Sequence, residues 1–236
     1  MERELIFQLN DAEVETIICL DLVYPKVRKA KAKTKLKNVI VTRMEDYLPF
    51  PKNLLYPLVQ KRKGLYPVID FSREGCLSLK KLMKNAEEFV EPAPINPKVD
   101  LALLQYTGGT TGRAKGVMLT HENLVANVTQ CHAWFYKSEA GEERFLGAVP
   151  FFHVYGMTVA MNLSIRMAGT LVMVPKFDVD LLLKTITKEK PTVFPGAPTM
   201  YIALINHPHL SKYDLSSIDA CISGSAPLPM EVQESF

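Results

Sequence analysis

Apolar residues recur along this chain in short runs separated by amphipathic stretches. The runs, several of them rich in β-branched side chains, predict strands, and the amphipathic stretches predict helices. Because strands and helices alternate, the pattern indicates an α/β fold with parallel-rich sheets flanked by helices. The predicted strands are residues 16–20, 38–42, 101–106, 145–149, 170–174, 192–194 and 220–223, and the predicted helices are residues 2–10, 121–135, 157–168, 179–188 and 199–206.

A proline-rich segment interrupts this alternation at residues 91–98. Three prolines there disfavour both a helix and a central strand, so we expect an exposed connector. The predicted domains are a partial N-terminal α/β subdomain over residues 1–95 and a second α/β subdomain over residues 96–236. In the second, Thr120 is predicted to cap the following helix, with Glu122 in its first turn favouring the helix dipole.

Residues 106–116 form the segment most suggestive of chemistry, with the sequence Tyr-Thr-Gly-Gly-Thr-Thr-Gly-Arg-Ala-Lys-Gly directly after an apolar run. Glycines bring backbone N–H groups close to an anion, hydroxyls add donors and lysine adds a positive charge, so this loop is predicted to bind phosphate. Its spacing is not that of the P-loop, since Gly116 occupies the Ser/Thr position. A Gly/Thr-rich surface turn is the alternative. The candidate phosphate ligands are Thr107, Gly108, Gly109, Thr110, Thr111, Gly112 and Lys115.

Two further segments follow predicted strands. Residues 149–157 contain His153 among apolar and aromatic residues, and residues 222–228 read Ile-Ser-Gly-Ser-Ala-Pro-Leu. Taken alone, the first fits a packed core histidine and the second an ordinary strand-to-helix loop. Ligands of open α/β sheets bind at the carboxyl ends of strands, however, so all three segments could contribute to one site.

Together these segments resemble the signature sequences of the adenylate-forming enzymes. Residues 175–178, 181–183 and 191–201 are typical of the acyl-CoA synthetases in that superfamily and are most similar to the long-chain fatty-acid–CoA ligases. Gly108 and Ala114 depart from the usual Ser and Pro, which weakens the expected grip on phosphate. The resemblance implies that the loop and Lys115 hold the β- and γ-phosphates and that His153 orients the carboxylate. It also implies that Gly224, Ala226 and Pro227 support the adenine.

The reaction implied by this resemblance has two halves. A fatty acid carboxylate attacks the α-phosphate of ATP to give acyl-adenylate and pyrophosphate, and the thiol of CoA then displaces AMP. Mg²⁺ is required, but the resemblance places its glutamate ligand and the ribose-binding aspartate beyond Phe236. We therefore expect an internal fragment of a longer enzyme, inactive by itself. Another carboxylic-acid–CoA ligase and a phosphate-binding, non-catalytic module are the alternatives, and a homodimer is a further expectation.

Composition adds limits to this picture. The chain has 236 residues, 47% of them hydrophobic, so it can bury a core, and its net charge of +3 is too small to indicate a nucleic acid partner. No apolar run reaches membrane-spanning length and the first residues lack a signal-peptide core, which favours a cytoplasmic protein. No metal site is predicted, because the four cysteines have no paired spacing and fit reduced, mostly buried thiols.

Basic residues are concentrated at residues 28–37 and again at 61–63. Such runs draw a protein to anionic lipid, which would suit an enzyme whose substrate partitions into membranes. Peripheral membrane association is thus one prediction, and a solvated connector on an exposed surface is the other.

Overall fold

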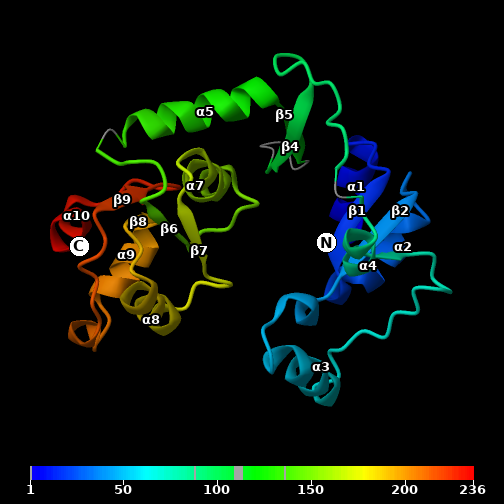
Figure 1. Cartoon of the computed structure of the whole chain (residues 1–236), viewed down its shortest axis with the longest axis horizontal. Helices are drawn as coiled ribbons and strands as arrows, with labels where there is room; N and C mark the ends of the chain where they lie inside the picture. Colours follow the sequence, from blue (N-terminus) through cyan, green and yellow to red (C-terminus); the bar gives the residue numbers. More distant parts are fainter. Residues whose placement is uncertain (1, 88, 109–113, 136) are drawn as a thin grey trace. The chain divides into compact units, whose positions relative to one another are not determined.

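The computed structural model describes residues 2–87, 89–108, 114–135 and 137–236 (Figure 1). Its contacts divide the chain into two compact units, Met1–Ile95 with Tyr106–Val117, and Asn96–Gln105 with Met118–Phe236. Each unit contains a parallel sheet accompanied by helices, which confirms the predicted α/β class. The subdomain division at residue 95 stays a prediction.

The first unit contains a parallel sheet in the order β1-β2-β3. The predicted bounds of its two longer strands are confirmed, and the short third strand was not predicted. Leu9, Tyr24, Val27, Val39 and Val41 are buried together in its core. The elements are α1 (Glu2–Asp11), β1 (Thr16–Leu20), α2 (Tyr24–Lys31), β2 (Asn38–Thr42), α3 (Lys52–Arg62), β3 (Leu77–Ser78) and α4 (Leu79–Lys84), with 3₁₀ turns at Asp21–Val23 and Met44–Tyr47.

Helix α2 changes the interpretation of the basic run at residues 28–37, whose first part is helical rather than a connector. Tyr24, Val27 and Ala30 recur every third residue and are buried, while the intervening basic side chains face solvent. The helix was missed because its three buried positions are a minority among lysines and arginines.

The second unit contains a four-stranded parallel sheet in the order β7-β6-β8-β9 (Figure 1). The predicted strands are all present, with β6 and β8 displaced by one or two residues. Helix α5 ends two residues earlier than predicted. The elements are α5 (His121–Ala133), β6 (Arg144–Gly147), α6 (Val154–Gly156), a π-helical segment (Met157–Asn162), α7 (Leu163–Arg166), β7 (Thr170–Met173), α8 (Val179–Glu189), β8 (Val193–Gly196), α9 (Pro198–Ile205), a 3₁₀ turn (Leu210–Lys212), β9 (Ala220–Ser223) and α10 (Met230–Ser235).

Both faces of this sheet are covered. Successive residues of a strand point to opposite faces, so Phe145 and Leu146 of β6 enter different clusters. Leu146 packs with buried residues of α8 and α9, whereas Phe145 packs with Val128 of α5 and Leu163. Burial on both faces is expected for a parallel sheet, and it leaves the ends of the strands as the sites accessible to a ligand.

The predicted cap at Thr120 is confirmed. Its hydroxyl accepts a hydrogen bond from the Asn123 N–H at 3.2 Å, and the Asn123 side-chain oxygen accepts one from the Thr120 N–H at 3.0 Å. Two N–H groups that would otherwise lack partners are thus satisfied at the start of α5. Within the described part of the chain, no helix combines the length and apolar character needed to cross a membrane.

The predicted phosphate loop lies between the two strands of a small sheet. This sheet consists of β4 (Leu101–Thr107) and β5 (Lys115–Thr120). Residues 108–114 are too few for a parallel crossover, so the two paired strands are antiparallel. Strand β5 was not predicted, and Lys115 therefore begins a strand instead of lying within the loop.

Candidate functional site

The site is built at one edge of the sheet in the second unit. Strands β6, β8 and β9 are adjacent and parallel, so their carboxyl ends lie at the same edge. The segment containing His153 follows β6, and the turn containing Gly224 follows β9. Sequence segments about 70 residues apart are therefore brought to the same edge of the fold, as the sequence pattern predicts.

Tyr155 connects the ends of these strands. Its hydroxyl lies 2.6 Å from the carbonyl oxygen of Ile222 in β9 and 3.0 Å from that of Gly196 in β8. The Gly224 N–H also donates to the Gly196 carbonyl, at 3.1 Å. Burial raises the pKa of Tyr155 to about 12, so its hydroxyl stays protonated and able to donate at neutral pH.

The ring of the same tyrosine explains why residue 224 is glycine. A Cβ at Gly224 would lie 2.3 Å from Cε2 of Tyr155, far inside van der Waals contact. Beyond it, Ser225 adopts a left-handed backbone with φ of 70°, and Ala226 and Pro227 are exposed. The turn therefore presents backbone and small side chains at its surface, as a flat ligand such as a purine requires.

We expect Gly224→Ala to destabilise this chain by about 1–3 kcal/mol, because the added methyl must displace the Tyr155 ring. Such a loss lowers the midpoint of thermal unfolding by roughly 3–10 °C in a protein of this size. Gly108→Ala is the matched control, since a Cβ there meets nothing within 4 Å. Equal midpoints for the two variants, measured by circular dichroism, would contradict the steric explanation.

His153 lies on the surface at the start of α6. Its ring packs on that of Phe152 with centroids 4.7 Å apart, and its carbonyl accepts a hydrogen bond from the Met157 N–H at 2.9 Å. Because the side chain is exposed, the packed core histidine considered above is excluded. The imidazole is accessible to a substrate, and its action on a carboxylate stays a prediction.

The helix predicted over residues 157–168 begins three residues earlier, at Val154, and ends at Arg166. It has three parts, α6, the π-helical segment and α7. A π-helical turn widens the backbone and is frequent at functional sites. Met157 and Thr158 line a cavity of about 170 Å³, whereas Ala160 is fully buried in the core. The other lining residues are Leu119, Asn123, Leu124, Asn127 and Val154.

Part of the predicted phosphate loop is described. Thr107 and Lys115 end and begin the paired strands, and both they and Gly108 are exposed. Across the hairpin, Gly116 packs on the Tyr106 ring, whose hydroxyl donates to the Asp11 carboxylate at 2.6 Å. Both ends of the loop are thus held by the first unit. The candidates Gly109, Thr110, Thr111 and Gly112 lie outside the described residues.

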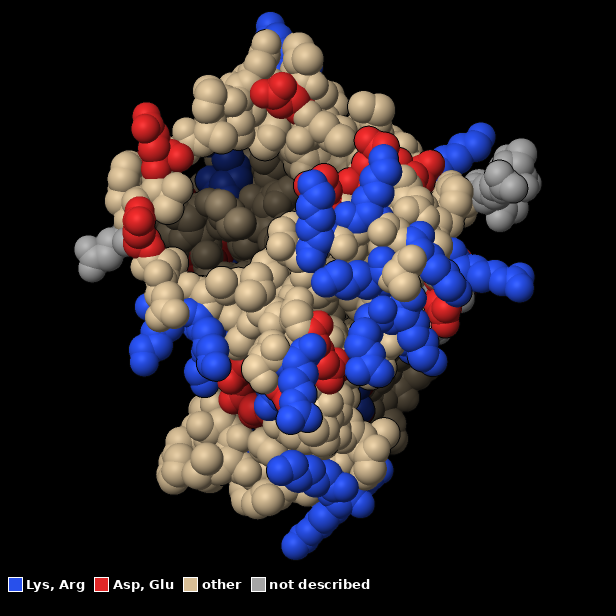
Figure 2. All heavy atoms as spheres, turned by 90° about the vertical axis from the view of Figure 1, so that its right-hand side faces the viewer, with Lys and Arg blue, Asp and Glu red and all other residues tan. Residues whose placement is uncertain are grey.

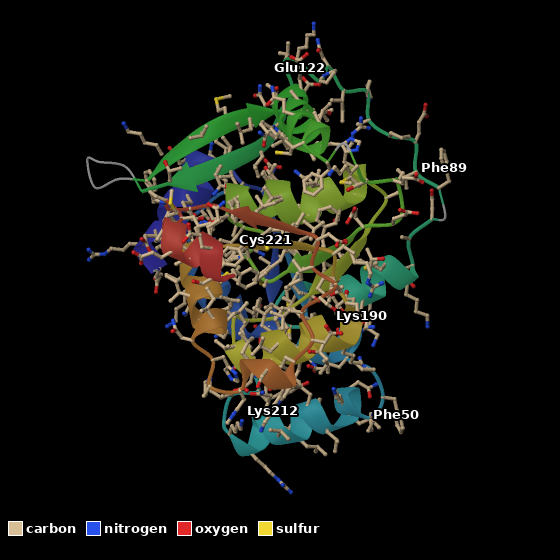
Figure 3. The ribbon with its side chains drawn as sticks, turned by 90° about the vertical axis from the view of Figure 1, so that its left-hand side faces the viewer. Phe50, Phe89, Glu122, Lys190, Lys212 and Cys221 are labelled. Carbon is tan, nitrogen blue, oxygen red and sulfur yellow. The ribbon has the colours of Figure 1, made fainter. Side chains whose placement is uncertain are left out.

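Three residues at the strand ends had no predicted role. Besides Tyr155, these are Tyr201, whose hydroxyl lies 2.9 Å from the carbonyls of Phe194 and Ile222, and Ser223. The Ser223 hydroxyl is buried with no hydrogen-bond partner in the described part of the chain. It lines a cavity of about 480 Å³ with Tyr201 and the exposed Cys221, which Figure 3 shows on β9.

The exposure of Cys221 corrects the expectation of mostly buried thiols. The roles of Tyr155 and Tyr201 could have been suspected from the glycines at the strand ends. Gly196 and Gly224 leave the space that the two tyrosine rings fill.

Comparisons with known proteins agree with this arrangement. The family profile described as "AMP-binding enzyme" matches residues 1–236. The chain is 52% identical to a long-chain-fatty-acid–CoA ligase of Bacillus subtilis, covering all of this chain and 42% of that protein. It superposes on ATP-bound MatB of Rhodopseudomonas palustris with a TM-score of 0.75 and 27% identity, covering 100% of this chain and 40% of that one. For a long-chain-fatty-acid–CoA ligase of Archaeoglobus fulgidus the TM-score is 0.75 and the identity 27%, covering 99% and 41%.

Proposed function

Since the chain belongs to the family of AMP-binding enzymes, we propose that the protein containing it activates a long-chain fatty acid in two steps, forming acyl-adenylate from ATP and then acyl-CoA. The chain spans about two fifths of the length of the curated relatives it matches, so the proposal concerns the longer protein. The observation that carries it is the 52% identity with the Bacillus subtilis ligase. The meeting of the His153 and Gly224 segments at one sheet edge supports it.

Each part of the site receives a role in this proposal. His153, exposed beside the wide helical segment, orients the fatty acid carboxylate by a hydrogen bond. The turn at Gly224, Ala226 and Pro227 supports the adenine, and Ser223 offers it a hydroxyl with no other partner in the described structure. Lys115 supplies positive charge to the phosphates, because a carboxylate and a triphosphate repel each other. The remaining candidates on the loop are Thr107, Gly108, Gly109, Thr110, Thr111 and Gly112.

The residues present fit ATP in two respects. Exposed Lys115 and Thr107 flank the glycine-rich connection, which suits a polyphosphate, and the unpaired hydroxyl beside a small-residue turn suits a base. Mg²⁺ would neutralise the charge of the triphosphate, and CoA would enter as the second substrate. A cytoplasmic location, a homodimer and the absence of a nucleic acid partner remain predictions.

The proposal is tested by pyrophosphate release from ATP and Mg²⁺ by the purified full-length protein. Palmitate should stimulate release at least about tenfold, because the carboxylate is the attacking group, and hexadecanol, which lacks it, should not. Stimulation by short or aromatic acids in place of palmitate would indicate another carboxylic-acid–CoA ligase. ATP binding without release for any acid would indicate a non-catalytic phosphate-binding module.

A further inference from the structure

Helix α3 in the first unit is turned with its apolar side outward. Leu54 with Leu58, and Leu55 with Val59, are pairs four residues apart, so the four side chains form two adjacent rows along one side of the helix. The exposed fractions of Leu54, Leu55, Leu58 and Val59 are 61%, 53%, 57% and 45%. No residue of α3 is buried, so the helix contributes nothing to the core of its unit.

The covered side of α3 mixes polar and apolar residues, since Asn53, Tyr56, Pro57 and Gln60 are half-buried. Asn53 and Gln60 are more covered than the leucines, and the Asn53 side-chain oxygen is buried with no partner among the described residues. A helix held by a protein core covers its leucines and leaves its amides in solvent, whereas the leucines of α3 are exposed and its amides are half-buried. The orientation of α3 therefore indicates a contact on its outer face.

Apolar exposure continues beyond the helix. Phe50 is 79% exposed, and Figure 3 shows its side chain at one end of α3 pointing away from the ribbon. Leu65 and Val68, which follow the C-terminal end of α3 in the chain, are 58% and 89% exposed. Exposed apolar side chains thus occur on α3 and on both segments that flank it, and clusters of exposed apolar residues mark interaction sites.

Basic residues frame this surface. Lys52 begins α3, Lys61 and Arg62 end it, and Lys63 follows, all exposed, whereas residues 52–63 contain no acidic residue. Exposed leucines bounded by lysine and arginine match the boundary between the acyl chains and the phosphates of a bilayer.

We propose that α3 is a membrane-surface helix that binds anionic phospholipid bilayers. This proposal assigns a surface to the peripheral membrane contact predicted from the sequence, and it does not depend on the ligase reaction. A second copy of the chain fits less well, because both ends of α3 are basic. Antiparallel packing of two copies would bring Lys52 against Lys61 and Arg62, and parallel packing would bring like ends together.

The longer basic run at residues 28–37 is a weaker candidate for this contact. Four of its basic side chains pair with carboxylates, which lowers the net positive charge of that face, and Figure 2 shows acidic side chains interspersed among the basic ones. The pairs are Arg28–Glu74, Lys33–Glu2, Lys35–Glu13 and Lys37–Glu15.

Vesicle flotation tests the proposal. The chain and the full-length protein are mixed with vesicles of phosphatidylcholine alone or with phosphatidylglycerol, and both proteins should float with the anionic vesicles. Leu54→Ser combined with Leu58→Ser should lower the partition coefficient at least about tenfold, because two leucines no longer enter the bilayer. Salt at roughly 0.5 M should also weaken binding.

Val125→Ser combined with Ile165→Ser is the matched control, since these side chains are 62% and 73% exposed on other helices. It should bind like the unchanged chain. Equal loss in both double variants, or binding by the isolated chain but not by the full-length protein, would overturn the proposal. The latter result would mean that the rest of the protein covers α3. Self-association through α3 without vesicle binding, seen by sedimentation, would overturn it as well.

A fluorescence measurement separates insertion of α3 from general adsorption. Trp134 is the only tryptophan and is 84% exposed, so its emission should change little when vesicles are added. In a Trp134→Phe chain, Leu58→Trp should give a blue shift and quenching by brominated lipid. A response from Trp134 equal to that of the residue 58 probe would contradict the assignment to α3. Pyrophosphate release is unaffected by either outcome, so this test and that of the proposed function fail separately.

Discussion

Acyl-CoA synthesis by the isolated 236-residue chain should be at least about 10³-fold slower than synthesis by the full-length protein. The chain corresponds to 42% of the Bacillus subtilis ligase, and the resemblance places a metal-binding glutamate and a ribose-binding aspartate in the remainder. Positioning and charge stabilisation act together in catalysis, so their loss multiplies. The measurement is palmitoyl-CoA formation followed by chromatography.

Thermal unfolding of the same preparation serves as the control for that result. A cooperative transition would show that the isolated chain is folded and that inactivity reflects missing groups. Palmitoyl-CoA formation within tenfold of the full-length rate would mean that the residues described here complete the active site by themselves.

His153→Ala in the full-length protein should slow adenylation about 10²- to 10³-fold while leaving the ATP dissociation constant within about threefold. The side chain is exposed, so its removal disturbs little packing, and its assigned role is a hydrogen bond to the carboxylate. Adenylation is measured by fatty-acid-dependent pyrophosphate release, and ATP affinity by equilibrium titration without fatty acid.

Lys115→Ala provides the matched comparison for His153→Ala. It removes the charge assigned to the phosphates and should weaken ATP binding about tenfold or more. If both variants lose ATP affinity equally, or His153→Ala leaves adenylation unchanged, the two roles are wrongly assigned.

Periodicity predicted the buried strands of this fold because apolar, β-branched runs are intrinsic to them. Periodicity failed to predict elements whose position or burial is decided by tertiary contacts. The sequence of α3 contains exposed leucines that periodicity would place inside a core, and β5 begins at Lys115 because its partner strand is next to it in space. Helix α2 has three buried positions hidden in a basic run.

The candidate site was predicted from motifs, which identify residues that could touch a ligand. Motifs do not report the residues that hold those groups in place. Tyr155 looked like one aromatic residue in an apolar run, and its hydrogen bonds to Gly196 and Ile222 depend on the order of the strands. That order cannot be read from a single sequence, because it is set by how the helices cross the sheet.

The ring of Tyr155, which occupies the space beside Gly224, also couples the substitutions that these two positions tolerate. A larger residue at 224 displaces the ring at 155, and a smaller residue at 155 leaves a void and loses the hydrogen bonds to β8 and β9, so either change alone costs stability. The stability of the chain therefore depends on the two residues jointly, although 68 intervening residues separate them in the chain. Substitutions at residues 155 and 224 are therefore expected to be non-additive in their effects on stability.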